Sequence, residues 1–412
     1  MQAVILAGGL GTRLSAVLPD TPKVLAPIDG KPFLHYQLTL LNKFGVKRVL
    51  MLTGHQGDKV EATFSNGFSY GFDINYIKEE YPLGTGGALL NAFNLLDDQF
   101  LLVNGDTFFD IDLDILESFF NVNELPGLMA LRFTERTDRY GLVSIDPNYR
   151  VCNFLEKKEL NSDRADGYIN GGIYILRKAH LAKYIAPVIK TMSLEKTVLP
   201  DLTKEGNLFG LPVGGKFIDI GVPEDYRLAQ EEIPKWIKLK KRPCLFLDRD
   251  GVLIQDTGYV HGFDLKFIPE TMELVREANR KGEWVIVITN QAGVARGFFD
   301  ETQIKATNSF IKSKLEADGL RIDDFFYCPY HPEGAIQQYK KHSLARKPGP
   351  GMLLKASETY PIDFQNSIMI GDKESDRVRL PYLYFKLFSH KFSTKLQTLG
   401  SKNDPKKDIT ND

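Results

Sequence analysis

Short apolar runs alternate with longer amphipathic segments along most of the chain. In the first half, the segments 3–7, 48–52 and 100–106 have the apolar character and the length of buried strands. The segments 33–45 and 86–96 repeat their apolar residues with the spacing of a helix face. This alternation predicts an α/β fold with a mostly parallel sheet and right-handed crossovers.

The same alternation begins again after a change in composition near residue 230. Acidic and then basic residues fill the segment 231–242, which is therefore predicted to be a linker. Beyond it, the pattern predicts strands at 244–248, 284–290, 325–329 and 367–372, separated by helices at 269–282, 301–319 and 351–360. We therefore expect two α/β domains, at 1–230 and 243–390, and a polar, disordered tail at 391–412.

The composition is that of an ordinary globular protein, but 412 residues are too many for one core. The net charge of −1 gives no field that would attract nucleic acid or an acidic membrane. Cys152, Cys244 and Cys328 are too far apart in sequence for a disulfide framework or a CxxC metal site, which predicts a reducing cytoplasm. The apolar N-terminal run is typical of a first strand, not of a signal peptide or a membrane span.

A glycine-rich loop follows the first predicted strand. Gly8, Gly9 and Gly11 would let the backbone approach a ligand closely and point its N–H groups at an anion. Arg13 and Lys23 add two cations nearby. The spacing matches neither the P-loop nor the third glycine of the dinucleotide fingerprint. The sequence therefore predicts either a phosphate-binding loop of another kind or a tight turn.

Other residues of the first half are also typical of a ligand site. Gly84 and Thr85 stand at the start of a predicted helix, where the backbone could contact a base or a sugar. Asp106 and Asp219 each follow an apolar run, at the end of the strand where open α/β sheets bind ligands. Together with the two cations, these carboxylates predict a site for a metal ion and a phosphate.

In this order, the motifs GGLGTRL, TPK, PLGTGGA, NGD and IDIGVPEDY resemble the sugar-1-phosphate nucleotidyltransferase family over about residues 1–230. The resemblance implies a Rossmann-like sheet on which a sugar 1-phosphate attacks the α-phosphorus of a nucleoside triphosphate. It implies nucleotide binding by Gly8, Gly9, Gly11, Gly84 and Thr85, charge stabilisation by Arg13 and Lys23, Mg²⁺ binding by Asp106 and Asp219, and sugar binding by Gly141, Glu156 and Asn170.

In the second half, four polar segments follow predicted strands or precede a helix. Asp248 and Asp250 end the first strand, Thr289 and Asn290 the second, and Asp372 the last, while Arg346 and Lys347 precede a helix. Carboxylates gathered at one sheet edge would repel one another strongly in a medium of low dielectric constant. A divalent cation and a lysine would remove that repulsion, so the pattern predicts phosphoryl chemistry.

The motifs DRDGVL, GYV, TNQAGVARG, YCP, RKPGPGM and GDKESD resemble the haloacid-dehalogenase-like phosphatases, in particular the heptose 1,7-bisphosphate phosphatase branch. The resemblance covers about residues 243–376 and implies a Rossmannoid sheet with a minimal cap. It implies that Asp248 is the nucleophile and Asp250 the general acid/base, and that Asp248, Asp372 and the backbone carbonyl of Asp250 hold Mg²⁺. It also implies that Thr289 and Lys347 bind the phosphoryl group. The residues implied in substrate binding are Asn290, Arg296, Arg346, Lys373 and the loop 258–260.

The sequence departs from that branch in two places. Only Cys328 remains of the Cys and His residues that hold a structural zinc in many relatives, so we predict that this chain binds no zinc. Beyond Asp376, the chain also lacks the small-residue helix and the glycine turn that the resemblance implies.

The two resemblances together predict one enzyme with two activities. The second domain would remove the 7-phosphate of a heptose 1,7-bisphosphate, and the first would join the product to a nucleotide, GMP from GTP by resemblance. Alternatives are a mannose-1-phosphate guanylyltransferase joined to a histidinol-phosphatase-like domain, or to a degenerate domain that serves as a scaffold. The expected partners are small substrates, with Mg²⁺ in both domains, and the sequence leaves a homo-oligomer open.

Overall fold

The computed structural model describes residues 1–9, 14, 17–135, 141–155, 165–184 and 191–388. The contacts of the chain define two compact units. Unit 1 comprises Met1–Arg132, Leu142–Leu155 and Tyr168–Leu239, and unit 2 comprises Phe133–Gly141, Glu156–Gly167 and Lys240–Asp412. Across the described ranges, no helix combines the length and the apolar character that a membrane crossing requires.

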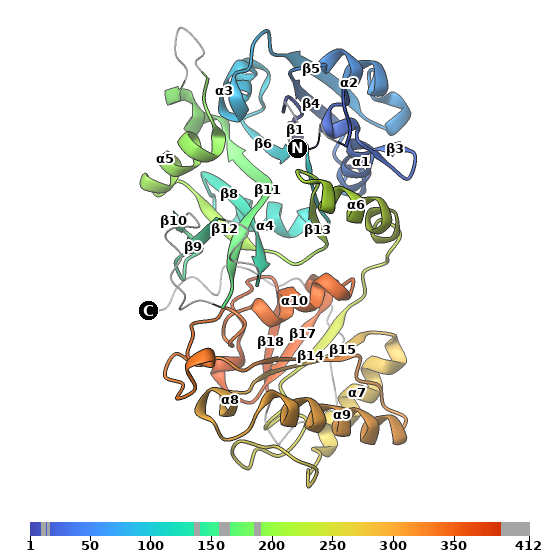
Figure 1. Ribbon diagram of the computed structural model, residues 1–412, viewed down its shortest axis with the longest axis vertical. Helices are drawn as coiled ribbons and strands as arrows, with labels where there is room; N and C mark the ends of the chain where they lie inside the picture. Colours follow the sequence, from blue (N-terminus) through green and yellow to red (C-terminus); the bar gives the residue numbers. More distant parts are fainter. Residues whose placement is uncertain (10–13, 15–16, 136–140, 156–164, 185–190, 389–412) are drawn as a thin grey trace. The chain divides into compact units, whose positions relative to one another are not determined.

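Unit 1 is a layered α/β structure (Figure 1). Its helices are α1 (Phe33–Lys43), α2 (Gly57–Phe64), α3 (Gly84–Asn91), α4 (Leu113–Val122), α5 (Leu199–Lys204) and α6 (Pro223–Trp236). Its strands are β1 (Gln2–Leu6), β2 (Pro27–Ile28), β3 (Lys31–Pro32), β4 (Arg48–Thr53), β5 (Asp73–Lys78), β6 (Gln99–Asn104), β7 (Thr107–Phe109), β8 (Gly127–Thr134), β9 (Leu142–Ile145), β10 (Val151–Leu155), β11 (Gly167–Arg177), β12 (Phe209–Pro212) and β13 (Phe217–Asp219).

The large sheet of unit 1 is only partly parallel. Its main path has the order β10-β9-β11-β6-β1-β4-β5, with β8 and β12 joined to it through β11. The strands β1, β4, β5 and β6 run parallel, as the alternating pattern predicted. In contrast, β11 runs antiparallel to β6, and β9 runs antiparallel to β10 and β11. The α/β class is confirmed, and the antiparallel extension is an addition that apolar runs alone do not indicate.

The helix α6 extends into the segment that was predicted to be a linker. It continues past Pro234 to Trp236, whereas the linker was predicted to begin at residue 231. Tyr226, Ala229 and Ile233 are spaced by three and four residues, and all three are buried in a core shared with α1 and β2. This apolar stripe holds the helix together although proline removes a hydrogen bond from its last turn.

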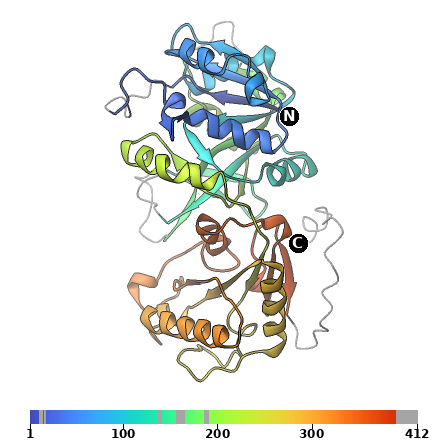
Figure 2. The same cartoon turned by 90° about the vertical axis from the view of Figure 1, so that its right-hand side faces the viewer.

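Unit 2 contains one parallel sheet of five strands with the order β16-β15-β14-β17-β18 (Figures 1 and 2). The strands are β14 (Cys244–Leu247), β15 (Trp284–Asn290), β16 (Asp324–Cys328), β17 (Ile368–Gly371) and β18 (Tyr384–Leu387). The helices are α7 (Pro269–Lys281), α8 (Gly293–Arg296), α9 (Glu301–Ala317) and α10 (Gly351–Thr359).

Alternate residues of β14 define the two faces of this sheet. Leu245 and Leu247 pack in the core that includes residues of α7 and α9, whereas the ring of Phe246 stacks on Phe364. In Figure 1, α10 lies on the other side of the sheet from α7 and α9. The atypical sequence beyond Asp376 forms the edge strand β18, which pairs with β17. The predicted tail at 391–412 lies outside the described residues.

Candidate active sites

A pair of strands in unit 1 brings two predicted metal-binding aspartates together. The strand β7 pairs antiparallel with β13, which places Thr107 opposite Asp219. The N–H of Ile220 also donates a hydrogen bond of 3.1 Å to the backbone carbonyl of Asp106. Asp106 and Asp219 are therefore neighbours at the end of two strands, although the sequence separates them by more than a hundred residues.

The charges of this pair are only partly compensated. The Nζ of Lys23 lies 3.0 Å from Oδ2 of Asp106, and Asp219 accepts a hydrogen bond of 2.8 Å from the N–H of Gly221. Burial, followed by the charge of Asp106, raises the pKa of Asp219. Two adjacent carboxylates, one of them with a raised pKa, form a donor set that suits Mg²⁺, because a cation would relieve their repulsion.

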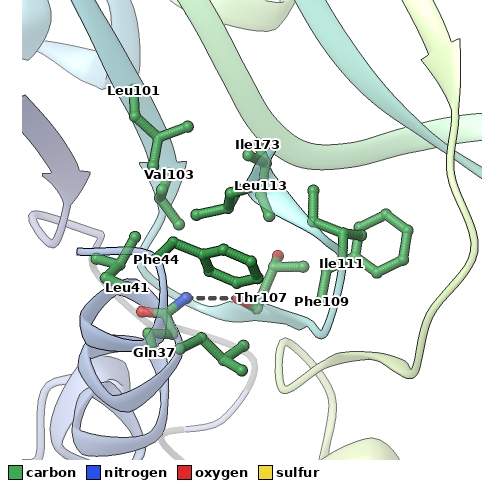
Figure 3. Close-up of a pocket in the computed structure, with 11 residues that line it drawn as sticks. Gln37, Leu41, Phe44, Leu101, Val103, Thr107, Phe109, Ile111, Leu113 and Ile173 are labelled. Atoms are coloured by element: carbon green, nitrogen blue, oxygen red, sulfur yellow. Dashed lines mark hydrogen bonds between the residues drawn. The ribbon is translucent and has the colours of Figure 1, made fainter. Parts of the chain in front are cut away.

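A buried amide supports the turn that carries Asp106. The Nε2 of Gln37 in α1 donates hydrogen bonds to the carbonyl oxygens of Asn104, at 2.8 Å, and Thr107, on either side of this turn. Gln37 also borders an apolar cavity of about 30 Å³ that is lined mainly by residues of α1, β6 and β7 (Figure 3). This cavity is too small for a sugar phosphate or a nucleotide, so we interpret it as a packing defect.

Backbone shape at the predicted nucleotide-binding residues leaves little room for side chains. A Cβ atom at Gly8 would lie 3.2 Å from the backbone nitrogen of Gly54, and one at Gly84 would lie 2.6 Å from the carbonyl oxygen of Met192. Thr85 donates a hydrogen bond of 2.8 Å from its hydroxyl to Glu195. A Cβ atom at Gly9 would have no neighbour within 4 Å, while Gly11 and Arg13 lie outside the described residues.

Glu79 lies beside this glycine loop, a position to which the sequence analysis gave no role. Its Oε1 would be 3.3 Å from a Cβ atom at Gly8, and its Oε2 accepts a hydrogen bond from the N–H of Leu83. Burial raises the pKa of this carboxyl group. The available signal was its position directly after β5, where parallel strands of the sheet end.

The three predicted sugar-binding residues are only partly described. Asn170 in β11 donates a hydrogen bond of 2.6 Å to the hydroxyl of Tyr174 and accepts one of 2.9 Å from the N–H of Gly172. Gly141 is exposed and directly precedes β9, and Glu156 lies outside the described residues. The ordered amide of Asn170 is thus the part of this predicted set whose orientation is defined.

In unit 2, two buried carboxylates, one half-buried carboxylate and a buried lysine form a cluster. Oxygen atoms of Asp248, Asp372 and Asp376 lie within 4.8 Å of one another. The Nζ of Lys347 lies 2.8 Å from Oδ1 of Asp248 and 2.7 Å from Oδ1 of Asp376. Asn290 fixes this lysine by accepting a hydrogen bond from its backbone N–H and donating one to its carbonyl. Asp376 is the member of this cluster for which the sequence predicted no role.

The cluster has the properties of a cation site. Among the described residues, the buried Oδ1 of Asp372 has no hydrogen-bond partner, which is a costly state for a carboxylate oxygen. Burial is the main cause that raises the pKa of Asp248 to about 7, and Lys347 opposes this shift. Carboxylate oxygen atoms gathered at the ends of β14 and β17, one of them without a donor, fit Mg²⁺.

Gly251 allows Asp372 to reach this cluster. Its φ angle is +92°, and a Cβ atom there would lie only 2.3 Å from Oδ2 of Asp372. A residue with a side chain would therefore be strained and would also displace the carboxylate. The glycine of the DRDGVL motif is a steric requirement of the site.

The other predicted residues of unit 2 have varied surroundings. Thr289 is buried and accepts a hydrogen bond from Gln291, while the carboxylate of Asp250 is bound by Arg249 and Gln291 and does not join the three-carboxylate cluster. Lys373 pairs with Asp256 at 2.9 Å, and Arg296 contacts the hydroxyl of Tyr259.

Arg346 has an unusual environment for a cation. Burial lowers its pKa, and its Nη1 atom has no hydrogen-bond partner within the described parts of the chain. A half-buried guanidinium with a free donor is suited to binding an anionic group of a substrate.

Oxygen atoms hold the loop after β16, where the resemblance raised the question of a zinc site. The Sγ of Cys328 lies 3.9 Å from the hydroxyl of Ser343. The carboxylate of Glu301 accepts hydrogen bonds of 2.7 Å from the hydroxyls of both Tyr327 and Tyr339. These bonds connect the loop to α9 and β16, a task for which a structural zinc would otherwise be suited. The absence of zinc stays a prediction.

The fold and the carboxylate pair of unit 1 define a nucleotidyl-transferring class, and comparison with known proteins identifies it. The profile of the nucleotidyl transferase family matches residues 2–235, and the chain belongs to this family. Over 238 residues, it is 39% identical to the D-glycero-alpha-D-manno-heptose 1-phosphate guanylyltransferase of Aneurinibacillus thermoaerophilus. The match covers 58% of this chain and 100% of that relative.

A separate region of the chain is similar to phosphatases. Over 137 residues, it is 42% identical to the D-glycero-beta-D-manno-heptose-1,7-bisphosphate 7-phosphatase of Rhodopseudomonas palustris, covering 33% of this chain and 76% of that relative. Among solved structures, a Bacillus anthracis protein assigned as a glucose-1-phosphate thymidylyltransferase matches with a TM-score of 0.51 and 23% identity. That match covers 58% of this chain and 96% of the other, and it supports the fold alone.

Proposed function

We propose that this chain is a bifunctional enzyme that acts on a heptose phosphate at two sites. Unit 2 removes the 7-phosphate of D-glycero-D-manno-heptose 1,7-bisphosphate, and unit 1 transfers GMP from GTP to the resulting heptose 1-phosphate. One observation carries the proposal: each unit gathers carboxylates and a lysine at the ends of its strands, and each is similar to enzymes named for one of these reactions.

In the transferase reaction, a phosphate oxygen of the sugar attacks the α-phosphorus of GTP and expels pyrophosphate. Asp106 and Asp219 would hold Mg²⁺, which neutralises the triphosphate and the charge that develops on it. Lys23 stays next to Asp106 and faces the same charge, while the glycine loop brings its N–H groups to the nucleotide. Asn170 orients the sugar through its amide.

In the phosphatase reaction, an oxygen of Asp248 attacks phosphorus, and the ester P–O bond breaks. Asp250 gives its proton to the leaving oxygen, then removes a proton from the water that attacks the aspartyl phosphate and releases phosphate. Lys347 keeps Asp248 charged and in place, while Thr289 and Arg346 bind the phosphoryl group and the substrate. Asp248, Asp372, Asp376 and the carbonyl of Asp250 would hold Mg²⁺, which offsets the negative charge of the phosphate.

Guanine is the base that suits Glu79. Its carboxylate lies beside Gly8, where the nucleotide loop begins, and a carboxylate only accepts hydrogen bonds. Among the four common bases, guanine alone presents two adjacent donors, N1–H and the exocyclic amine, to such a group. The variant Glu79→Gln should therefore lower kcat/KM for GTP by about 10- to 100-fold and reduce the preference over ATP.

The two sets of relatives differ in the anomer that their names specify, alpha for the transferase and beta for the phosphatase. Because both sites of one chain must accept the same sugar to act in sequence, we expect both to use the α-anomer. Each anomer of the bisphosphate should be incubated with Mg²⁺ and a mixture of GTP, ATP, CTP and UTP, and the products identified by mass spectrometry. GDP-heptose from the α-anomer is expected.

Single substitutions in each unit test which unit carries out which reaction. Asp248→Asn should abolish phosphate release alone, and Asp106→Asn should abolish nucleotidyl transfer alone. If phosphate is never released, or if pyrophosphate is released without heptose 1-phosphate, the proposal is wrong. Transfer to mannose 1-phosphate in preference to the heptose would favour the alternative substrate, and a unit 2 without phosphatase activity would favour a scaffold.

A further inference from the structure

The arginine inside the DRDGVL motif is completely buried, which is rare for a charged side chain. Arg249 is 0% exposed, although it stands between two aspartates at the end of β14. Each of its three nitrogen atoms has a partner. Nε and Nη2 donate to Oδ1 and Oδ2 of Asp250 at 2.9 and 3.1 Å, Nη2 also donates to the carbonyl of Val260 at 2.7 Å, and Nη1 donates to Asn308 at 3.2 Å.

The arginine thus connects Asp250 to two other parts of unit 2. Val260 belongs to the loop that precedes α7, and Asn308 is a buried residue of α9. Gln291 holds the same carboxylate from another side, with its Nε2 atom 2.9 Å from Oδ2 of Asp250. A bidentate pair fixes both the position and the plane of a carboxylate, which a single lysine could not do.

The pattern of these bonds distinguishes the two oxygens of Asp250. Oδ2 accepts from both Arg249 and Gln291, so its two lone-pair directions are occupied. Oδ1 accepts only from Nε of Arg249 among the bonds formed by described residues, which leaves one lone pair for another donor. A water molecule that must lose a proton to Asp250 therefore has one oxygen to approach.

We propose that Arg249 is the positioning residue that makes Asp250 a general base through Oδ1, in the step that hydrolyses the aspartyl phosphate. The inference rests on the phosphatase activity proposed above. Arg249 fixes the position and the plane of the carboxylate of Asp250, while Asn308 and the carbonyl of Val260 hold Arg249. The first step, in which Asp248 is phosphorylated, depends little on Asp250 when the leaving group is acidic, because such a group departs without a proton.

Rapid mixing of the full-length protein and Mg²⁺ with p-nitrophenyl phosphate separates the two steps. Arg249→Lys should release about one nitrophenol per chain in a burst, followed by a linear phase about 10- to 100-fold slower than that of the wild type. Asn308→Ala, which removes only the support of Arg249, should produce the same pattern with a smaller decrease. The burst also counts the chains that are folded and able to use Asp248.

Arg276→Lys is the matched control, since Arg276 is an exposed arginine paired with Glu273 on α7, and it should leave both phases unchanged. A burst that shrinks in proportion to the linear rate would mean that Arg249 is only structural, and an unchanged linear rate would also overturn the inference. Failure of the proposed function has a different result: the wild type would then release no more nitrophenol than Asp248→Asn does.

Discussion

The two carboxylate sites differ in how much of their charge the protein compensates by itself. In unit 2, the side chain of Lys347 is 1% exposed and contacts two carboxylates, Asp248 and Asp376, which are 9% and 3% exposed. In unit 1, Lys23 is 16% exposed and contacts one carboxylate, Asp106, which is 37% exposed. The phosphatase site is therefore assembled before any substrate binds, whereas the transferase carboxylates remain partly hydrated.

The difference in exposure suits the ligands that the proposed function assigns to each site. A phosphate monoester is small and is hydrolysed very slowly without catalysis, so a rigid site with charges in fixed positions is an advantage. A nucleoside triphosphate is itself a large, highly charged ligand that arrives with metal. An open pair of aspartates can adapt to it at a lower cost in buried charge.

The largest expected effect comes from removing the buried lysine of unit 2. Lys347→Met should lower the rate of phosphate release by a factor of at least about 10³. It should also lower the free energy of unfolding by about 3–5 kcal/mol, because two buried carboxylates lose their partner. Phosphate release and denaturant unfolding measure the two effects. Lys355→Met is the control: Lys355 lies in α10 and forms an exposed pair with Glu135, so a change below about 1 kcal/mol is expected. Similar losses in both variants would contradict the comparison.

The matching change in unit 1 should affect activity but hardly stability. Asp106→Asn is expected to lower nucleotidyl transfer by about 10²–10³-fold, since a metal ligand and the partner of Lys23 are lost together. The midpoint of unfolding should barely change because Asp106 is partly hydrated. Pyrophosphate release and thermal unfolding test this. Asp97→Asn removes a half-buried carboxylate of similar exposure, paired with Arg48, and should preserve activity. A large loss of stability in Asp106→Asn would mean that the two sites are equally rigid.

A smaller effect is expected from adding one methyl group to the phosphatase site. Gly251→Ala would place a Cβ atom 2.3 Å from Asp372, so this carboxylate must move and phosphate release should decrease by about 10- to 100-fold. Titration of activity with Mg²⁺ should show weaker metal binding. Gly282→Ala has a comparable backbone strain, with φ of +73° and open space around the added atom, and should leave phosphate release unchanged. Equal losses in both variants would show that strain alone explains the effect.

The smallest effect is expected in the loop after β16, for which we predict no zinc site. Glu301→Gln weakens two charge-assisted hydrogen bonds from Tyr327 and Tyr339, and we expect a loss of about 1–2 kcal/mol in unfolding free energy. Phosphate release should decrease less than about threefold. Added zinc should change neither quantity. Recovery of stability with one equivalent of zinc would contradict the predicted absence of a zinc site.

Residues that share a strand end were predictable because continuous apolar runs mark strands that are buried on both faces. Asp248 and Asp372 were recognised in this way, and the structure brings them together. Asp376 was harder to assign, because its place depends on a tight turn that brings its Cβ to 2.1 Å from where a Cβ of Gly371 would be. Nothing in the local sequence distinguishes Arg249, a buried arginine, from an exposed one.

Strand direction and helix ends were also beyond the sequence pattern. The apolar runs predicted a mostly parallel sheet and did not indicate the antiparallel strands β9 and β11, since strand direction depends on the connections. The charged residues from 231 onward suggested the start of a linker, yet the buried stripe of α6 continues the helix to Trp236. In each case, contacts between distant residues decided against a local preference.

The position of β14 at the centre of the unit 2 sheet has a consequence for synthesis on the ribosome. This strand emerges first, but one of its two neighbours, β17, belongs to the far end of the unit's sequence. One edge of the apolar strand β14 therefore stays unpaired until almost the whole unit has been translated. An unpaired apolar strand edge of this kind favours aggregation, so the unit is most exposed to it before β17 has been made.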